Sequence, residues 1–205
     1  MRILVATNNK NKLAEFQRML NLPGVQFLTP EEAGLPADFD VEETGLTFEE
    51  NAELKATQYA RAANLPAMAD DSGLVVDALN GEPGIYSKRY AGENATDPQR
   101  IALLLSKIAD VPDEKRTGRF VAAIALANPD GRIVVTCRGI SEGTIAWEPR
   151  GSNGFGYDPI FLPAGFHGRT FAELNDEEKD AISHRGNAFR LIRPDIETYV
   201  EHAGK

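Results

Sequence analysis

Cysteine is nearly absent from this sequence, because Cys137 is the only one among 205 residues. A single cysteine cannot form an internal disulfide, and the β-branched residues 133–136 before it are typical of a strand, so a reducing compartment suits the chain. A chain of this length can bury a sizeable core without disulfides or structural metal ions. We therefore expect one globular domain over residues 1–205.

Long apolar runs are also missing. No 18 consecutive residues are apolar, which excludes a transmembrane helix. The N-terminal residues Met1 to Ala6 are followed by the polar Thr7 before any signal-peptide core is built, so no targeting segment is predicted. These two absences predict a soluble, cytoplasmic protein.

Basic residues are fewer than acidic ones. The chain has 22 lysines and arginines against 31 aspartates and glutamates, and the resulting net charge of −9 disfavours non-specific binding to a nucleic-acid backbone. The asymmetry is strongest between residues 19 and 54, where no lysine or arginine occurs. Nine carboxylates fall in that segment: Glu31, Glu32, Asp38, Asp40, Glu42, Glu43, Glu49, Glu50 and Glu53.

Three common signatures are absent as well. The sequence has no G-x-x-x-x-G-K-[ST] phosphate loop, no G-x-G-x-x-G after its first apolar run and no H-E-x-x-H. A P-loop, a dinucleotide-binding fold and a zinc peptidase of the H-E-x-x-H type are therefore all unsupported.

The hydrophobic pattern at the N-terminus predicts an α/β fold. Residues 2–6 form a short apolar run typical of a strand, and apolar residues over 13–20 then recur at helical spacing. Residues 25–28 are a second strand candidate. A strand, a helix and a strand in this order indicate a βαβ unit.

Later patterns add further elements. Thr47 to Glu50 has the spacing of a capping box and begins a helix that Pro66 closes. Short strands at residues 67–69 and 74–76 place the paired aspartates in the link between them. The remaining elements are a helix from Asp97 to Leu105, a hairpin of residues 120–126 and 133–137, a glycine-rich loop over 151–158 and a polar helical tail from Asp176.

The polar turn from Thr7 to Lys12 is a candidate phosphate site. It lies at a predicted helix N-terminus, where free backbone amides and the helix dipole favour an anion, with Lys12 as a point charge. An ordinary capped helix explains the same residues, because threonine and asparagine are common N-cap residues.

The adjacent carboxylates of Asp70 and Asp71 are a candidate metal site. They are costly to place together unless a positive group lies beside them. Mg²⁺ takes oxygen ligands and shares them with substrate phosphates, and Glu42 or Glu43 could supply its second protein carboxylate. The sequence Asp-Asp-Ser-Gly is also good turn chemistry, so a simple chain reversal is the alternative.

Two groups of residues in the last third of the chain could bind a base. Phe155 and Tyr157 alternate with Gly154 and Gly156 on a loop, where they could stack on a flat ring while Asp158 accepts hydrogen bonds. Phe155 could equally fill the core.

His184 and Arg185 lie next to each other, and Lys179 comes just before them. Arginine only donates hydrogen bonds, so a base bound by Arg185 should present a carbonyl group rather than an amino group. A solvated helix face is the alternative for Lys179 and Arg185.

Six ordered motifs, taken jointly, are much more specific than any one of them. They are Thr7 to Lys12, Glu42 to Phe48, Ala69 to Gly73, Pro83 to Tyr90, Phe155 to Pro159, and Ile182 to Gly186. With these motifs the chain resembles the inosine/xanthosine triphosphate pyrophosphatase family over almost its whole length.

The resemblance implies a fold and an activity. It implies an elongated mixed central sheet of α/β type with flanking helices and two lobes around a substrate cleft. It further implies Mg²⁺-dependent hydrolysis of ITP, dITP and XTP to the nucleoside monophosphate and pyrophosphate, by a homodimer that cleanses the nucleotide pool.

The resemblance also implies residue roles. Asp71 would be the catalytic carboxylate and a metal ligand, and Lys12 would act in catalysis on the phosphates. Glu42 or Glu43 would be the other metal ligand. The predicted substrate contacts are Thr7, Asn8, Asn9, Lys10, Asn11, Lys12, Lys55, Ser72, Lys88, Phe155, Gly156, Tyr157, Asp158, Lys179, His184 and Arg185. Position 8 is asparagine where many relatives carry glycine.

Two rival functions fit the same residues. One is a pyrophosphatase of different nucleotide specificity, which a substrate panel would separate. The other is a regulatory module that binds a nucleotide without turnover, which predicts tight binding and no release of pyrophosphate in excess Mg²⁺.

Overall fold

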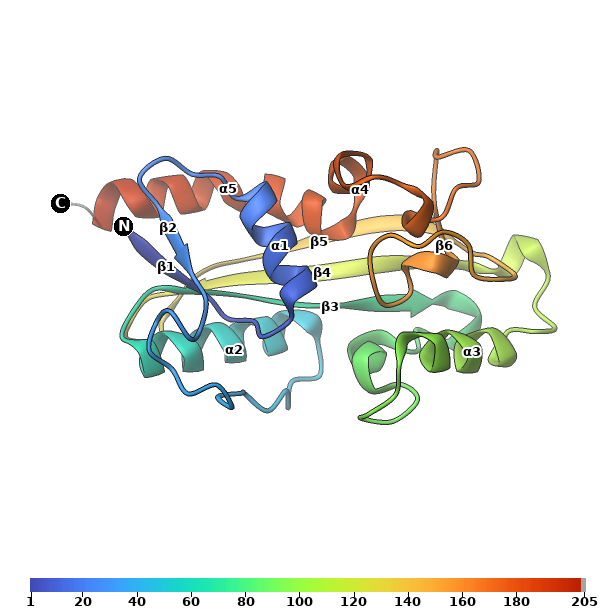
Figure 1. Ribbon diagram of the computed structural model, residues 1–205, viewed down its shortest axis with the longest axis horizontal. Helices are drawn as coiled ribbons and strands as arrows, with labels where there is room; N and C mark the ends of the chain where they lie inside the picture. Colours follow the sequence, from blue (N-terminus) through green and yellow to red (C-terminus); the bar gives the residue numbers. More distant parts are fainter. Residues whose placement is uncertain (204–205) are drawn as a thin grey trace. The chain divides into compact units, whose positions relative to one another are not determined.

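A computed structural model describes residues 1–203 of the chain as a mixed α/β structure (Figure 1). Its strands are β1 (Arg2–Val5), β2 (Gln26–Leu28), β3 (Ala67–Val76), β4 (Thr117–Ala127), β5 (Ile133–Ile145) and β6 (Phe161–Pro163). Its α-helices are α1 (Lys10–Met19), α2 (Phe48–Ala63), α3 (Asp97–Lys107), α4 (Asp176–Ile182) and α5 (His184–Ala203). No helix in this part of the chain combines the length and the apolar character that crossing a membrane requires.

The six strands form one sheet in the order β2-β1-β3-β4-β5-β6. Strand β1 pairs in parallel with β2 and with β3, whereas β5 pairs with β6 in the antiparallel direction. The parallel pair β1–β2 is connected by α1, as a strand–helix–strand unit requires. The prediction of a mixed central sheet with flanking helices is therefore confirmed.

The chain divides into two compact units. The first unit contains Met1–Asp71, Ala122–Gly139 and the chain from Ala188 onward, and the second contains Ser72–Val121 and Ile140–Asn187. Strands β3, β4 and β5 contribute residues to both units.

The core of the first unit lies between its strands and two helices. Phe16 of α1 meets Phe189 of α5 edge to face, with ring centroids 4.7 Å apart, and both pack in one cluster with Ile3 and Val5 of β1. Side chains alternate along a strand, so Leu4 points to the opposite face, and α2 covers that face (Figure 1). Helices therefore shield both faces of the short parallel strands.

The core of the second unit is built around aromatic rings. The ring of Phe120 on β4 lies 4.8 Å from that of Phe161 and 5.7 Å from that of Phe171. Ile101 and Leu104 of α3 belong to the same buried cluster. The contacts of Phe161 and Phe171 fix the segment that follows the glycine-rich loop.

The predicted helix starts are confirmed, with one change at α2. Thr96 caps α3, and its capping box closes through Gln99. Thr47 caps α2 and accepts from the backbone amide of Glu50 at 3.1 Å, but the Glu50 carboxylate accepts from the amide of Leu46 instead of closing the box.

The predicted break at the paired aspartates is wrong. Strand β3 is continuous from Ala67 to Val76, so Asp70 and Asp71 lie within a strand, and the chain reversal is excluded. A Cβ atom on Gly73 would lie 2.4 Å from the carbonyl oxygen of Gly84, so glycine is needed here for close backbone approach rather than for a turn.

The polar tail from Asp176 is helical but interrupted. Ser183, with extended backbone angles of φ −69° and ψ 157°, separates α4 from α5. A Cβ atom on Gly186 would lie 1.9 Å from the carbonyl oxygen of Asp180, so only glycine allows the two helices to meet this closely.

Candidate active site

Strand β3 directs the two adjacent aspartates of the first unit in opposite directions. Both side chains are buried, at 2% exposure for Asp70 and 5% for Asp71. The Asp70 carboxylate lies 2.9 Å from the ammonium group of Lys12 on α1, and Asp71 contacts residues of α2. The alternation of a strand thus turns the Asp70 carboxylate toward Lys12 and the Asp71 carboxylate toward α2.

Lys55 of α2 is the cation at the centre of these carboxylates. Its Nζ atom donates to Glu43 Oε1 at 2.8 Å and to the backbone carbonyl of Asp70 at 2.7 Å, and it lies 3.5 Å from Asp71 Oδ1. Burial alone would lower the pKa of Lys55, but the carboxylates of Asp71, Glu43 and Asp70 outweigh it, so the pKa is raised. Lys55 therefore stays charged although it is buried. We call Lys12, Glu43, Asn51, Lys55, Asp70 and Asp71 the Asp71 cluster.

The Asp71 carboxylate holds a proton more readily than an exposed aspartate. Burial is the largest cause that raises its pKa, and the Glu43 carboxylate adds to it. Lys55, Lys12 and a hydrogen bond of 3.1 Å from Asn51 Nδ2 act in the opposite direction without cancelling the rise. A buried carboxylate with a raised pKa is a candidate for proton transfer.

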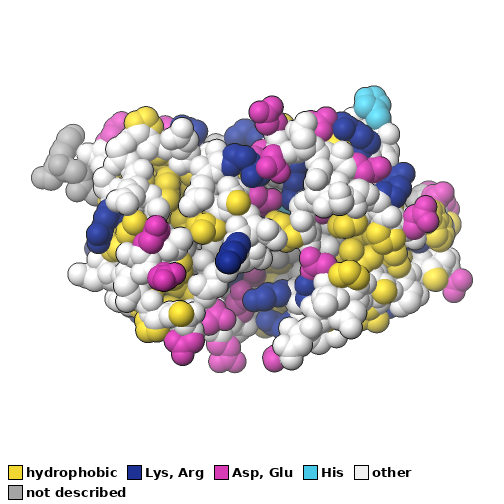
Figure 2. Space-filling model, viewed as in Figure 1, with side chains coloured by type: hydrophobic (Ala, Val, Ile, Leu, Met, Phe, Trp, Pro, Cys, Tyr) yellow, Lys and Arg dark blue, Asp and Glu magenta, His cyan; other side chains and the backbone are white. Residues whose placement is uncertain are grey.

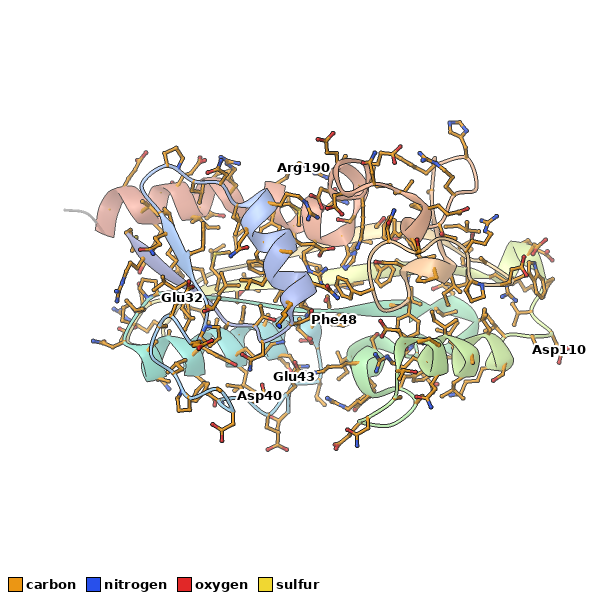
Figure 3. The ribbon with its side chains drawn as sticks, viewed as in Figure 1. Glu32, Asp40, Glu43, Phe48, Asp110 and Arg190 are labelled. Carbon is orange, nitrogen blue, oxygen red and sulfur yellow. The ribbon has the colours of Figure 1, made fainter. Side chains whose placement is uncertain are left out.

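The two glutamates that the sequence could not separate differ in the structure. Glu43 is half-buried and reaches Lys55, whereas Glu42 is exposed. Figure 3 shows Glu43 on the coil that precedes α2. The structure therefore brings Glu43, and not Glu42, to the Asp71 cluster.

The donor set of the cluster fits Mg²⁺ in part. Among residues 1–203, no three His, Cys, Asp or Glu side chains are gathered so that they could hold a metal ion alone. Asp71 and Glu43 nevertheless offer carboxylate oxygens around one shared cation, Lys55. Because Mg²⁺ usually takes only one or two protein carboxylates and completes its shell with water and substrate phosphates, these two residues suit it.

Acidic side chains also gather outside the cluster. Figure 2 shows these acidic side chains along the lower edge of the face in view. They lie over the coil that precedes α2 in Figure 1, and Figure 3 labels Asp40 among them. Glu31, Glu32, Asp38, Asp40 and Glu42 are exposed in this segment. Lys12 and Lys55 are the cations that offset this charge within the Asp71 cluster.

The turn from Thr7 to Lys12 forms a capped helix start. Asn9 is the N-cap of α1, and its side-chain oxygen accepts from the amides of Asn11 at 2.9 Å and Lys12 at 3.3 Å. Thr7 Oγ1 accepts from the amide of Asn9, and Asn8 Nδ2 donates to the carbonyl of Phe39. The expectation of free amides is therefore wrong for three of these residues, because side chains already accept their hydrogen bonds. Lys10 is exposed at the start of the helix.

In the second unit, Asp158 organises the glycine-rich loop. Its carboxylate is 3% exposed and accepts from the amide of Phe155 at 2.8 Å and from Lys179 Nζ at 2.8 Å. A Cβ atom on Gly154, whose φ is +74°, would lie 2.1 Å from that carboxylate. The Asp158 carboxylate thus holds the loop and Lys179.

The two aromatic residues of the loop have different environments. Tyr157 is 3% exposed in the core, and its hydroxyl donates to the carbonyl of Ser87 at 3.1 Å. The expectation that the Tyr157 ring stacks on a base is therefore wrong. Phe155 is half-buried, and Gly156 between them donates its amide to Asp97 Oδ2 at 2.7 Å.

Two buried cations lie against the Phe155 ring. Lys179 Nζ is 5.0 Å and Arg185 Cζ is 5.6 Å from its centroid. Arg185 is 2% exposed and donates to Ser72 Oγ at 2.6 Å. The solvated-face alternative for these cations is therefore wrong. We call Ser72, Phe155, Asp158, Lys179 and Arg185 the Arg185 cluster.

Two predicted contacts lie elsewhere in the second unit. The His184 ring is 4% exposed and stacks on Phe120, with centroids 4.7 Å apart and 11° between the planes, so it belongs to the core. Lys88 is exposed, and its carbonyl accepts from Arg100 at 2.8 Å.

Sequence reasoning missed Asn51 and Asp97. Asn51 is fully buried on α2 and contacts Asp71, and Asp97 holds the amide of Gly156. The sequence signal for Asn51 was an asparagine in the apolar stripe of α2. Asp97 gave no such signal, because its sequence context indicates only an ordinary helix start.

Comparison with known proteins places the chain in a family. A sequence model described as the Ham1 family matches residues 3–195. A dITP/XTP pyrophosphatase of Mycolicibacterium paratuberculosis is 49% identical over 203 residues, which cover 98% of each chain. A dITP/XTP pyrophosphatase of Coxiella burnetii is 49% identical over 193 residues, which cover 94% of each chain.

Solved structures agree. A HAM1 protein from Coxiella burnetii is 46% identical with a TM-score of 0.86, covering 97% of this chain and 99% of that one. A nucleoside-triphosphatase, dITP/XTP pyrophosphatase, from Mycobacterium abscessus is 48% identical with a TM-score of 0.76, covering 95% and 100%. Sequence and fold both match over nearly the whole length, and this chain therefore belongs to the Ham1 family.

Proposed function

We propose that this protein hydrolyses non-standard purine nucleoside triphosphates, such as ITP, dITP and XTP, to the nucleoside monophosphate and pyrophosphate. The observation that carries the proposal is the 49% identity, over 98% of both chains, to a relative named dITP/XTP pyrophosphatase. The Asp71 cluster supports the chemistry, and the Arg185 cluster supports the choice of base. Such an activity would remove deaminated purines from the nucleotide pool.

Asp71 and Glu43 are the residues that would hold Mg²⁺. Both present carboxylate oxygens beside Lys55, and Glu43 is favoured over Glu42 because Glu42 is exposed. When bound, Mg²⁺ would neutralise charge on phosphate oxygens and lower the pKa of a nearby water.

Asp71 would orient the attacking water and accept its proton. Burial, supplemented by Glu43, raises the pKa of Asp71, which makes this carboxylate a stronger base than an exposed aspartate. Asn51 contacts its Oδ2 atom and Lys55 lies near its Oδ1 atom, so these two residues orient the carboxylate.

Lys12 and Lys55 would act on the phosphate side. Lys12 lies at the first turn of α1, where the positive end of the helix dipole adds to its charge. A fixed positive charge at this point would stabilise the leaving pyrophosphate. The phosphates are also predicted to contact the turn before Lys12, formed by Thr7, Asn8, Asn9, Lys10 and Asn11. For this, the phosphates would have to share with the Asn9 side chain the backbone amides of Asn11 and Lys12, which that side chain caps.

The Arg185 cluster would bind the base and sugar, with Ser72 as a further contact. Arg185 and Lys179 carry donors only, so they match the 6-oxo group of a deaminated purine. The half-buried ring of Phe155, with both cations against it, offers a flat surface for stacking. Gly156, Tyr157 and His184 stay in the proposal as base or sugar contacts, Tyr157 and His184 through their backbones because their side chains are buried. The exposed Lys88 stays in it as a phosphate contact.

The test is release of pyrophosphate by the purified protein. We expect rapid release from ITP, dITP and XTP with Mg²⁺, and none without a divalent cation. A protein that binds ITP tightly but releases no pyrophosphate would be the regulatory module instead. A protein that prefers a pyrimidine triphosphate would be a pyrophosphatase of another specificity.

The homodimer and the cytoplasmic location belong to the same proposal. They rest on the resemblance to the family. Sedimentation equilibrium of the pure protein would test the dimer, and fractionation of expressing cells would test the location.

A further inference from the structure

Asn51 occupies an unusual place for an amide side chain. It lies in the first turn of α2, on the buried face beside apolar neighbours such as Phe48 and Ala52, and its exposed fraction is 0%. A buried amide is costly unless its donors and its acceptor are used. Its contacts therefore identify what the residue does.

Both ends of the Asn51 amide are engaged. Nδ2 donates to Asp71 Oδ2 at 3.1 Å, and Oδ1 accepts from the backbone amide of Gly45 at 2.8 Å. The opposite orientation of the amide would turn its oxygen to a carboxylate and its nitrogen to an N–H group, and both contacts would be repulsive. The chemistry of the two neighbours thus fixes one orientation.

The contact with Gly45 reaches the coil that carries Glu43. A Cβ atom on Gly45 would lie 2.7 Å from Asn51 Oδ1, so the coil can approach α2 only with glycine at this position. The next amide along the coil, that of Leu46, donates to Glu50 at 2.6 Å. The first turns of α2 therefore hold the coil just after Glu43, which Figure 3 labels on that coil.

We propose that Asn51 is a positioning residue that sets the geometry of Asp71 and Glu43 together. One donor holds Asp71 Oδ2 and leaves Oδ1 on the side of Lys55, while one acceptor holds the turn that carries Glu43. This inference rests on the proposed function, because it assigns Asn51 to the two carboxylates on which that function depends. Leucine would fill the same space but would leave both partners without a hydrogen bond.

The activity experiment compares Asn51→Asp with Asn51→Leu. Asn51→Asp keeps the acceptor for Gly45 but replaces the donor to Asp71 by a second carboxylate. We expect kcat for ITP to fall about 10- to 100-fold in both variants, as for residues that orient metal ligands, with KM changed less than about threefold. The control is Thr57→Val, which removes a hydrogen bond of the same helix to Gly131 and should leave both constants unchanged.

A stability experiment tests the contact without any turnover. Asn51→Asp alone sets two carboxylates against each other and should lower Tm. The double variant Asn51→Asp/Asp71→Asn exchanges donor and acceptor, so Tm should recover while hydrolysis stays lost. The matched control Asn51→Asp/Asp70→Asn removes the same charge one residue away, on the other side of β3, and should not recover Tm.

The outcomes separate this inference from the proposed function. A folded Asn51→Asp protein with wild-type kcat would overturn the inference, and so would equal Tm values for the two double variants. If the wild type hydrolyses no nucleotide, the proposed function fails, while the Tm comparison still decides whether Asn51 positions Asp71.

Discussion

Asp71 is the residue on which most of the proposed chemistry depends. It lies in a strand whose register is fixed by pairing with β1 and whose neighbour Asp70 faces the other way. Its raised pKa follows first from burial, which also explains why Asn51 and Lys55 must lie beside it. One carboxylate thus combines a protected environment with two groups that fix its orientation.

Asp71→Asn should abolish turnover without unfolding the chain. The substitution keeps the size of the side chain and an acceptor for Asn51, but removes the base and a proposed metal ligand. We expect a loss of kcat on the order of 10³-fold or more, with Tm close to wild type. Pyrophosphate release from ITP measures kcat, and a thermal melt of the same protein measures Tm.

Asp70→Asn is the matched control for that substitution. Its carboxylate pairs with Lys12 at 2.9 Å, whereas Asn51 donates to Asp71, so a smaller loss is expected. An equal loss of kcat in both variants would show that the two carboxylates depend on each other in catalysis.

Glu43 and Glu42 offer a second matched pair. Glu43→Gln removes a carboxylate that reaches Lys55, whereas Glu42→Gln changes an exposed neighbour. Because a lost carboxylate ligand weakens cation binding, Glu43→Gln should raise the Mg²⁺ concentration for half-maximal activity about 10-fold, and Glu42→Gln should not. A Mg²⁺ titration at saturating ITP measures both. If only Glu42→Gln raises this Mg²⁺ concentration, Glu42 and not Glu43 is the metal ligand.

At the scale of elements, the sequence predicted those parts that local signals determine. The helix starts after Thr47 and at Asp97 followed from capping residues, and the parallel pair β1–β2 followed from the apolar pattern. The break at Asp70 and Asp71 was wrong, because strand pairing overrode the local turn preference of Asp-Asp-Ser-Gly.

Site residues could be predicted where a local sequence motif contains them. They could not be predicted where their role depends on a partner that is distant in the sequence. The contact of Asn51 spans 20 residues to Asp71, and that of Asp97 spans 59 residues to Gly156. No local pattern contains either pair. Tyr157 and His184 show the converse, since their motif suggested a binding role while the fold uses their rings in the core.

The first residue of helix α3 holds the glycine-rich loop through a hydrogen bond. Asp97, its first residue, accepts the Gly156 amide at 2.7 Å and pairs with Arg100, which in turn donates to the carbonyl of Lys88. Asp97→Ala should release this amide and loosen the loop on which Phe155 lies.

The expected result is faster hydrogen exchange at Gly156 and a KM for ITP raised several-fold, with kcat less affected, because the loop belongs to the proposed base contacts and not to the reacting centre. Arg150→Ala is a suitable control, since it removes a donor to the carbonyl of Gly168 in the same unit. Unchanged exchange at Gly156 would contradict this role of α3.

At the scale of the whole molecule, each compact unit holds one of the two residue clusters. The first unit holds the carboxylates and lysines of the Asp71 cluster, and the second holds the Arg185 cluster, whose two cations, Lys179 and Arg185, carry donors only. The net charge of −9 should slow the approach of a triphosphate, so productive binding depends on these local cations rather than on the overall field.

Choice of base is the prediction that tests this division. Arg185 and Lys179 only donate, so the 6-oxo group of a purine offers them an acceptor, whereas the 6-amino group of adenine meets another donor. A buried donor left without its acceptor costs about 1 to 3 kcal/mol, and several together reach the 10⁴-fold range of discrimination. ATP should therefore be a very poor substrate. GTP also carries a 6-oxo group, so weaker discrimination is expected against it.

The measurement is kcat/KM for ITP, XTP, GTP and ATP with the wild type and with Arg185→Ala. Removal of the guanidinium should lower kcat/KM for ITP far more than for ATP and so compress the ratio between them. Asp71→Asn is the control, because it should lower the rate for all four nucleotides without favouring any. If the wild type hydrolyses ATP as fast as ITP, donors do not select the base, and the selectivity assigned to the Arg185 cluster is wrong.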